Sequence, residues 1–256
     1  MNSFIPWVGG KSRLRKQIIS LFPAEQPGLY VEVFGGAGWV LFGRDQHAKI
    51  EVFNDRDGHL INLYRCIQHH CEELQREILH GAAEMSLCSR ELLGDYLQQL
   101  NVRGLTDIQR AARYFYIIRI SYGARKETFC CNRRTLNGST ARLPEIQQRL
   151  RDVVIENQDF ERLIRTYNRP EALFYCDPPY FNAEQFYQGF GPGDHERLRT
   201  ALEGVKGRFV LSYNDVQEIR EMYQGYNIIT TERANDLSSK HGAGRAAYKE
   251  LIITNY

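Results

Sequence analysis

Two short segments of the sequence combine residue types that could do chemistry. Residues 34–38 read Phe-Gly-Gly-Ala-Gly, and residues 177–180 read Asp-Pro-Pro-Tyr. Glycine lets a backbone approach a ligand closely, whereas a carboxylate beside a flat aromatic ring can accept hydrogen bonds from a heterocycle that stacks on the ring. The first segment is therefore a candidate binding turn and the second a candidate reactive turn.

The glycine turn gains meaning from the acidic residue that follows it. Asp55 lies about 20 residues further on, the spacing at which a carboxylate accepts hydrogen bonds from ribose hydroxyls in nucleotide-binding units. Glycine used only for turn geometry, or a helix-capping role for Asp55, is the competing interpretation, and for Asp57 we favour capping. The pair of features indicates a nucleoside pocket.

The Asp177 segment suits a reaction at an aromatic amine. Its two prolines fix the backbone and donate no N–H, which leaves carbonyl oxygens able to accept hydrogen bonds. An aromatic amine is a poor nucleophile because its lone pair is delocalised into the ring. Acceptors at Asp177 and Pro178 would localise that pair and favour attack on a sulfonium methyl, with Pro179 stiffening the turn and Tyr180 stacking on the base. An amine of a paired base is reachable only after the base is flipped out of the duplex.

The pattern around these turns is that of an α/β fold. We expect strands at residues 29–34, 49–54, 153–156, 172–176, 209–213, 226–231 and 249–254. We expect helices after the glycine turn and at 57–68, 160–167, 195–205 and 216–223, with helical periodicity from 71 to 122, where Thr106 is an N-cap, and a long loop from 123 to 144. The core then consists of residues 1–70 and 151–256, with a helical insertion at 71–150.

Composition excludes several other classes of protein. The chain has 256 residues, 43% of them hydrophobic and 25% charged, which suits a globular domain. The first residues have no apolar secretory segment and no run approaches a membrane span, so we expect a cytoplasmic protein with no membrane partner. Cys66, His69, His70 and Cys71 could be drawn as a metal cluster, but no second spaced pair accompanies them, so we expect no metal.

Taken together, the motifs resemble the Dam-like family (D12 class, alpha group) of DNA adenine-N6 methyltransferases. Residues 6–11 (Pro-Trp-Val-Gly-Gly-Lys) are similar to the N-terminal cofactor motif of that family, residues 34–38 to its glycine loop and residues 177–180 to its catalytic tetrapeptide. Residues 209–212 resemble the strand beyond the target-base pocket, and residues 249–256 the closing strand. The motifs recur in one order over roughly both outer thirds of the chain.

The resemblance implies a fold, a cofactor and roles for individual residues. The fold would be a Rossmann-like methyltransferase fold, with a mixed seven-stranded sheet and an inserted helical DNA-recognition domain. S-adenosylmethionine would be the cofactor and double-stranded DNA the partner. The residues implied in cofactor binding are Trp7, Lys11, Phe34, Gly35, Gly36, Gly38, Asp55 and Asp177, and the catalytic ones are Asp177, Pro178, Pro179 and Tyr180.

The middle of the chain departs most from the family pattern, yet it is rich in cations. Residues 119–123 resemble the DNA-contacting segment only loosely, and residues 124–142 do not follow its hairpin. Cationic side chains far outnumber acidic ones between residues 107 and 151, which favours a DNA-binding face over a solvated helical surface. The expected contacts are Arg119, Tyr122, Arg125, Lys126, Arg133 and Arg134.

Three alternatives and several properties stay open at this point. Cytosine N4 needs the same acceptors as adenine N6, although Asp as the first tetrapeptide residue favours adenine. A DNA-binding relative without turnover is the second alternative, and an RNA substrate is the third. A phosphate loop is excluded because Ile5 stands where that motif needs glycine five residues before Gly10. The target sequence, a restriction partner, the origin of the chain and its oligomeric state, a monomer included, are not determined.

Overall fold

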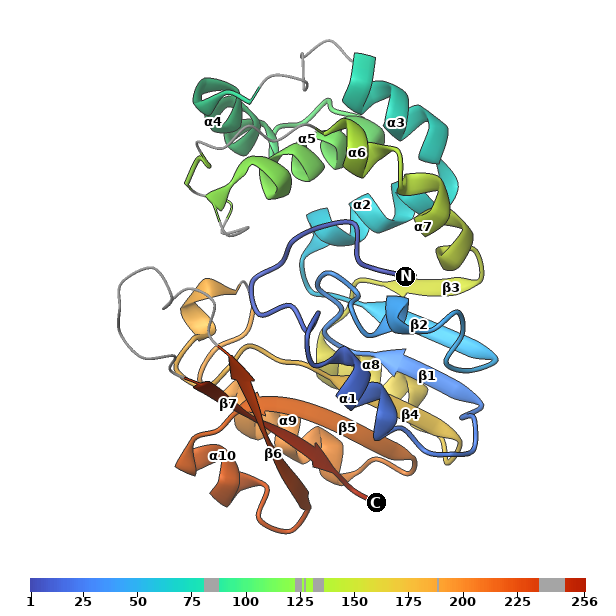
Figure 1. Ribbon diagram of the computed structural model, residues 1–256, viewed down its shortest axis with the longest axis vertical. Coiled ribbons are helices and arrows are strands. Elements are labelled where there is room, and N and C mark those ends of the chain that lie inside the picture. The colour runs from blue at the N-terminus through green and yellow to red at the C-terminus, as the bar shows by residue number, and fades with distance from the viewer. Residues whose placement is uncertain (81–87, 123–125, 127, 131–135, 188, 235–246) are drawn as a thin grey trace. The chain divides into compact units, whose positions relative to one another are not determined.

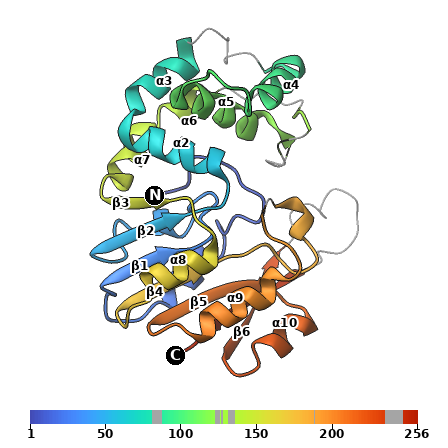
Figure 2. The same cartoon turned by 180° about the vertical axis from the view of Figure 1, so that it is seen from behind.

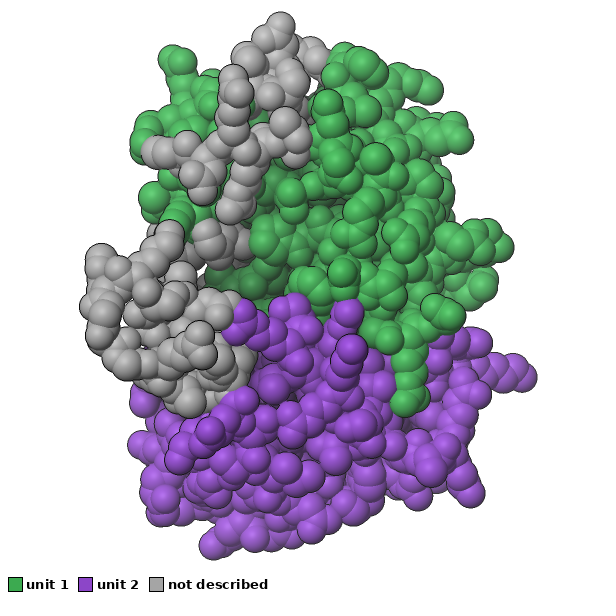
Figure 3. All heavy atoms as spheres, viewed as in Figure 1, with its two compact units in different colours: residues 1–10, 36–45, 57–157 green, residues 11–35, 46–56, 158–256 purple. Residues whose placement is uncertain are grey.

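The structure is a computed structural model that describes residues 1–80, 88–122, 126, 128–130, 136–187, 189–234 and 247–256. The chain forms two compact units, coloured separately in Figure 3. Unit 1 comprises Met1–Gly10, Gly36–Asp45 and Asp57–Asn157, and unit 2 comprises Lys11–Gly35, Gln46–Arg56 and Gln158–Tyr256. Each unit is thus assembled from three separate stretches of sequence.

A seven-stranded mixed sheet has the order β3-β2-β1-β4-β5-β7-β6. Strands β2, β1, β4 and β5 run parallel, whereas β7 is antiparallel to both β5 and β6. The strands are β1 (Leu29–Glu32), β2 (Ile50–Asn54), β3 (Val153–Glu156), β4 (Ala172–Cys176), β5 (Arg208–Asn214), β6 (Asn227–Ala234) and β7 (Ala247–Thr254). All seven strands predicted from the sequence are therefore present, with ends shifted by a few residues.

The parallel strands bring the ends of the expected motifs to one edge of the sheet. Val31 is in register with Val52 on one side and with Phe174 on the other, and Cys176 is in register with Leu211. Because parallel strands all end at the same edge, the residues that follow β1, β2, β4 and β5 emerge there together. Every residue of β1 and β4 is buried, as expected for parallel strands covered on both faces.

Helices of unit 2 cover both faces of its strands. Helix α1 (Arg15–Ser20) lies on the face seen in Figure 1, and α8 (Phe160–Tyr167) and α9 (Asp194–Glu203) lie on the face seen in Figure 2. Helix α10 (Gln217–Met222) contributes Ile219 to the same buried cluster as Leu198 of α9 and Leu211 of β5. This apolar core holds the strand ends rigidly beneath the expected site.

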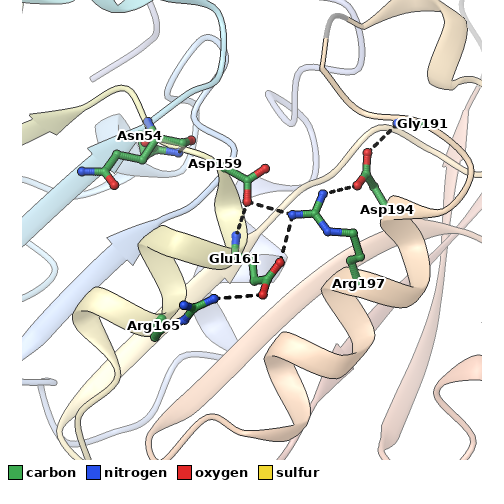
Figure 4. Close-up of polar contacts among 8 residues, drawn as sticks. Asn54, Asp159, Glu161, Arg165, Gly191, Asp194 and Arg197 are labelled. Carbon is green, nitrogen blue, oxygen red and sulfur yellow. Dashed lines mark hydrogen bonds and ion pairs between the residues drawn. The ribbon is translucent and has the colours of Figure 1, made fainter.

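A polar network joins α8 to α9 near the end of β2. Arg197 of α9 reaches Asp159 (3.1 Å) and Glu161 (2.9 Å) at the start of α8, and it also pairs with Asp194 (Figure 4). Asn54, the last residue of β2, donates to the carbonyl oxygens of Val33 (2.9 Å) and Gln158 (3.2 Å). These contacts tie the start of α8 to the sheet edge.

Unit 1 is mainly helical. Its helices are α2 (Gly58–His69), α3 (Cys71–His80), α4 (Arg90–Gln99), α5 (Asp107–Ile120), α6 (Asn137–Thr140) and α7 (Leu143–Leu150). The N-cap Thr106 forms the capping box with Gln109 that stabilises the start of α5, and Ala111, Ala112 and Phe115 bury its inner face. Asp57 caps α2 by accepting from the backbone N–H groups of His59 and Leu60, which confirms the capping role favoured for it.

Two expectations about helices are wrong. No helix starts at the glycine turn, where only a short 3-10 turn, η1 (Leu41–Gly43), follows. Gly36 (φ +49°) and Gly38 (φ +64°) are left-handed, a conformation that cannot continue into a right-handed helix. The loop expected at 123–144 is also wrong in its last part, because α6 (Asn137–Thr140) lies within it and α7 begins at Leu143, with Pro144 in its first turn and Leu143, Ile146 and Leu150 buried. Among the residues that the structure describes, no helix has both the length and the apolar composition needed to cross a membrane.

Candidate active site

Asp177 is held by a cation and a hydroxyl directly after β4. Lys11 Nζ lies 2.6 Å from Asp177 Oδ1, and Ser212 Oγ of β5 donates to the same oxygen at 3.1 Å. The Lys11 side chain is only 3% exposed and that of Asp177 is 18% exposed. Two neighbouring strands and the N-terminal segment of unit 2 therefore fix the carboxylate in one orientation.

The electrostatic setting of Asp177 works against its negative charge. Burial raises the pKa of Asp177 above the ordinary carboxyl value of 3.8, and the nearby charge of Glu250 acts in the same direction. Lys11 and the Ser212 hydrogen bond act in the opposite direction but only partly offset burial. The carboxylate is thus a stronger hydrogen-bond acceptor than an exposed one, and Lys11 is the main group that keeps it ionised.

Tyr180 is oriented by contacts at its hydroxyl and on its ring. Its hydroxyl donates to Glu250 Oε2 of β7 at 2.5 Å, and Lys11 Nζ lies 4.7 Å from the centre of its ring. Burial, followed by the charges of Asp177 and Glu250, raises the pKa of Tyr180 far above its ordinary value. The phenol therefore stays neutral, and its ring is a fixed platform with a cation at one face.

The backbone beyond the tetrapeptide is also tied to the sheet. Asn214, the last residue of β5, accepts from Phe181 N (3.0 Å) and donates to Phe181 O (3.1 Å). Behind this turn, the buried imidazole of His195 contacts Tyr213 Oη (2.7 Å) and Glu184 Oε1 (2.6 Å). The loop after Asp177 is accordingly held at two points that are three residues apart.

Asp55 follows β2 at the same edge of the sheet. Asn54 anchors the backbone just before Asp55 through its contacts with Val33 and Gln158. Burial, and then the charges of Asp177 and Asp55, raise the pKa of Tyr187 well above its ordinary value. Tyr187 is therefore within electrostatic reach of both carboxylates, and the expected ribose-binding and catalytic acids belong to one charged edge of unit 2.

The glycine turn contributes to both units. Gly35 N donates to Asn54 O at 2.7 Å, and a Cβ atom on Gly35 would lie 2.3 Å from the Phe53 ring, so only glycine fits between this turn and β2. In unit 1, a Cβ on Gly36 would lie 2.8 Å from the indole of Trp7. Trp7 and Gly36, two of the residues expected to bind a cofactor, are thus in direct contact.

The residues expected to contact DNA lie in unit 1 or outside the described residues. Arg119 is on α5, and the Tyr122 side chain just after this helix is 57% exposed. Lys126 lies 2.9 Å from Asp57 and 4.9 Å from the centre of the Trp7 ring. Arg125, Arg133 and Arg134 fall outside the described residues.

Several residues of the site were not assigned roles from the sequence. Ser212, Asn214 and Glu250 lie on β5 and β7, and Tyr187 follows the Asp-Pro-Pro-Tyr segment. A signal existed for Ser212 and Glu250, because both are polar residues within otherwise apolar strands and both are buried. Within the described ranges, no three or more His, Cys, Asp or Glu side chains gather where they could share a metal ion.

The fold and site define a class of enzyme. A parallel sheet extended by an antiparallel pair, with acidic side chains at its carboxyl edge and a buried Asp-Pro-Pro-Tyr turn, is the arrangement of a Rossmann-like methyltransferase. Sequence comparison is more specific: residues 7–237 match the D12 class N6 adenine-specific DNA methyltransferases, and the chain belongs to that family. It is therefore an enzyme that methylates DNA.

Two relatives align with the whole chain at low identity. The type II methyltransferase M1.LlaDCHI of Lactococcus lactis subsp. cremoris is 24% identical, covering 100% of this chain and 96% of the relative. The type II methyltransferase M.CviBI of Paramecium bursaria Chlorella virus NC1A is 23% identical, covering 100% of both chains. Among solved structures, a precorrin 8W decarboxylase of Methanobacterium thermoautotrophicum has a TM-score of 0.40 at 12% identity, covering 95% of this chain and 89% of that one. That structural likeness is too distant to bear on the fold or the function.

Proposed function

We propose that this chain transfers a methyl group from S-adenosylmethionine to the N6 amine of an adenine that is flipped out of double-stranded DNA. The observation that carries the proposal is the Asp177 carboxylate, held by Lys11 and Ser212 at the end of β4. Membership of a family described as N6 adenine-specific supports adenine as the target base.

Asp177 and Pro178 are the acceptors that activate the amine. Lys11 and Ser212 both contact Asp177 Oδ1, so we assign Oδ2 to the first amine hydrogen and the carbonyl oxygen of Pro178 to the second. Together they draw the lone pair of nitrogen away from the aromatic ring and orient it for attack. We assign the Tyr180 ring, over which Lys11 Nζ lies, to stacking with the extruded base.

The residues present fit the proposed cofactor. S-adenosylmethionine supplies an electrophilic methyl group on a positively charged sulfur. Asp55 and Asp177 place two negative charges at the carboxyl edge of the sheet, which suits ribose hydroxyls and a cationic ligand. The Trp7 indole lies directly against the backbone of Gly36, and any residue with a side chain at position 36 would clash with it. We therefore assign Asp55 to the ribose, Asp177, Lys11 and Trp7 to the remainder of the cofactor, and the turn formed by Phe34, Gly35, Gly36 and Gly38 to its close backbone contacts.

DNA recognition is assigned to residues 71–150. Exposed Tyr122 and the arginines of this stretch of sequence, Arg119, Arg125, Arg133 and Arg134, support this assignment, since phosphate contacts supply much of the affinity for DNA. The catalytic core is then formed by residues 1–70 and 151–256.

Labelled methyl transfer to DNA tests the proposal. The chain is incubated with S-adenosylmethionine carrying an isotopic methyl label and with unmethylated DNA, and the digested nucleosides are analysed by mass spectrometry. We expect labelled N6-methyladenine, and Asp177→Ala should abolish it. The control variant Asp152→Ala, which replaces an exposed aspartate, should leave methyl transfer intact. Labelled N4-methylcytosine in its place, or undiminished transfer by Asp177→Ala, would contradict the proposal.

A further inference from the structure

Lys126 lies in the segment expected to contact DNA, yet its ammonium group contacts a cluster of unit 1 formed by Asp57, Tyr114 and Trp7. Its Nζ donates to Asp57 Oδ2 (2.9 Å) and to Tyr114 Oη (3.0 Å). The same atom lies 4.9 Å from the centre of the Trp7 ring, within the range of a cation–π interaction. The side chain is 34% exposed, so much of it is withdrawn from solvent.

The backbone at Lys126 is shaped for this inward orientation. Its φ is +65°, a left-handed value that is unusual for a residue with a side chain. Its N–H donates to Ser121 Oγ at the end of α5, at 3.2 Å. A residue selected only for a flexible contact with phosphate would not need an unfavourable backbone angle and a backbone anchor.

Asp57 connects Lys126 to the start of α2. Oδ1 of Asp57 accepts from the N–H groups of His59 and Leu60, whereas Oδ2 receives Lys126 and Tyr114. Burial would raise the pKa of Asp57, but Lys126 and Tyr114 outweigh burial and leave that pKa below its ordinary value. The ammonium is therefore balanced by a nearby carboxylate, which weakens its attraction for a DNA phosphate.

Trp7 is the remaining member of the cluster. Its indole lies against Gly36, where an added Cβ atom would lie 2.8 Å from the indole ring. The carbonyl oxygen of Gly36 in turn accepts from Tyr64 Oη of α2 at 3.1 Å. Gly36 and the Lys126 ammonium are thus both neighbours of the indole.

We propose that Lys126 is a positioning residue for the cofactor, which holds the Trp7 indole in its binding orientation and so links the DNA-recognition segment to the S-adenosylmethionine site. This inference rests on the proposed function, because it takes Trp7 to contact the cofactor. It also implies that a DNA contact that changes the geometry between Lys126 and Trp7 changes the affinity for the cofactor, and that bound cofactor changes the affinity for DNA by the same factor.

Cofactor affinity without DNA, measured by isothermal titration calorimetry, is the first test. Lys126→Met should weaken S-adenosylmethionine binding about tenfold, the size expected for a partly buried cation–π contact. Lys126→Arg should restore most of the affinity, and Lys49→Met, which removes an exposed lysine of unit 2, should leave it unchanged. In a Trp7→Phe background the effect of Lys126→Met should shrink, because the smaller ring binds a cation more weakly.

DNA affinity measured across a series of salt concentrations separates this role from a phosphate contact. We expect Lys126→Met to keep the wild-type dependence of log affinity on log salt. A slope reduced by about one, together with unchanged cofactor affinity, would identify a phosphate contact and overturn the inference. Wild-type protein that is folded but does not bind S-adenosylmethionine would overturn the proposed function, and the inference with it. Thermal unfolding of each variant confirms that affinities are compared between folded proteins.

Discussion

The side chain of Asn214 forms two hydrogen bonds with the backbone of Phe181, accepting at 3.0 Å from N and donating at 3.1 Å to O. Asn214 ends β5, and Phe181 is the first residue after the Asp-Pro-Pro-Tyr tetrapeptide. One side-chain amide of the sheet thereby anchors the backbone just after the turn that contains Asp177.

Asn214→Ala should lower the methyl-transfer rate about 100-fold with little loss of stability, because reacting groups misplaced by about 1 Å lose rates of that order. Single-turnover kinetics and chemical denaturation measure the two effects. Asn227→Ala is the matched control, since the Asn227 amide also donates to a backbone carbonyl of unit 2, that of Tyr256. A rate equal to that of the wild type would show that the Phe181 contacts do not position the turn.

The acid limb of the pH–rate profile should report on Asp177. In the proposed mechanism this carboxylate must be ionised to accept the amine hydrogen, so the rate should rise as the pH increases through its pKa, which burial raises above 3.8. Lys11 lowers that pKa, and Lys11→Met should therefore move the acid limb to higher pH, whereas Lys11→Arg keeps the charge and should move it less. Rates are measured at saturating cofactor and DNA. If the acid limb of Lys11→Met lies at the same pH as that of the wild type, the group that titrates there is not Asp177.

Gly207→Ala should destabilise the protein by about 1–3 kcal/mol, the usual range for overpacking. A Cβ there would lie 2.2 Å from Ala172 O and 2.7 Å from Arg169 O, and these backbone atoms cannot move without disturbing the start of β4. Gly204→Ala provides the control, because its Cβ would meet only Ala201 O, at an ordinary 3.8 Å. Urea denaturation compares the variants, and equal stabilities for the two would contradict the predicted clash.

Asp57→Asn should cost about 1 kcal/mol at pH 7, since asparagine can still cap α2 but cannot pair with Lys126. The pKa of Asp57 is lowered in the folded protein, so its charge stabilises the fold above the ordinary value of 3.8, and this stabilisation is lost as the pH falls through the lowered pKa. The difference in unfolding free energy between wild type and Asp57→Asn should therefore shrink below pH 4. A difference that is constant from pH 7 to pH 3 would exclude the ion pair as its source.

The sequence predicted the strands more reliably than the helices and loops that connect them. Buried parallel strands need continuous apolar runs, and Leu173, Phe174 and Tyr175 show such a run just before Asp177. The helix expected after the glycine turn is absent from residues 34–48, all of which the structure describes, because Gly36 and Gly38 adopt left-handed backbone angles. A glycine permits such angles, but its presence in the sequence does not show whether it adopts them. Helix α7 was missed because the expected loop was extended through Pro144, a residue that also suits the first turn of a helix.

The positions of the Asp-Pro-Pro-Tyr turn after one strand and of Asp55 after another were thus determined by the sequence alone, since each depends on neighbours within a few residues. The partners of these groups were decided only by the tertiary structure. Tyr180 forms a hydrogen bond with Glu250, 70 residues away in the sequence. Lys126 pairs with Asp57 at a separation of 69 residues, and Phe181 forms a hydrogen bond with Asn214 at a separation of 33. Local patterns record which face of a strand or helix is apolar, but contacts at these separations depend on strand order and on how the chain returns to the sheet.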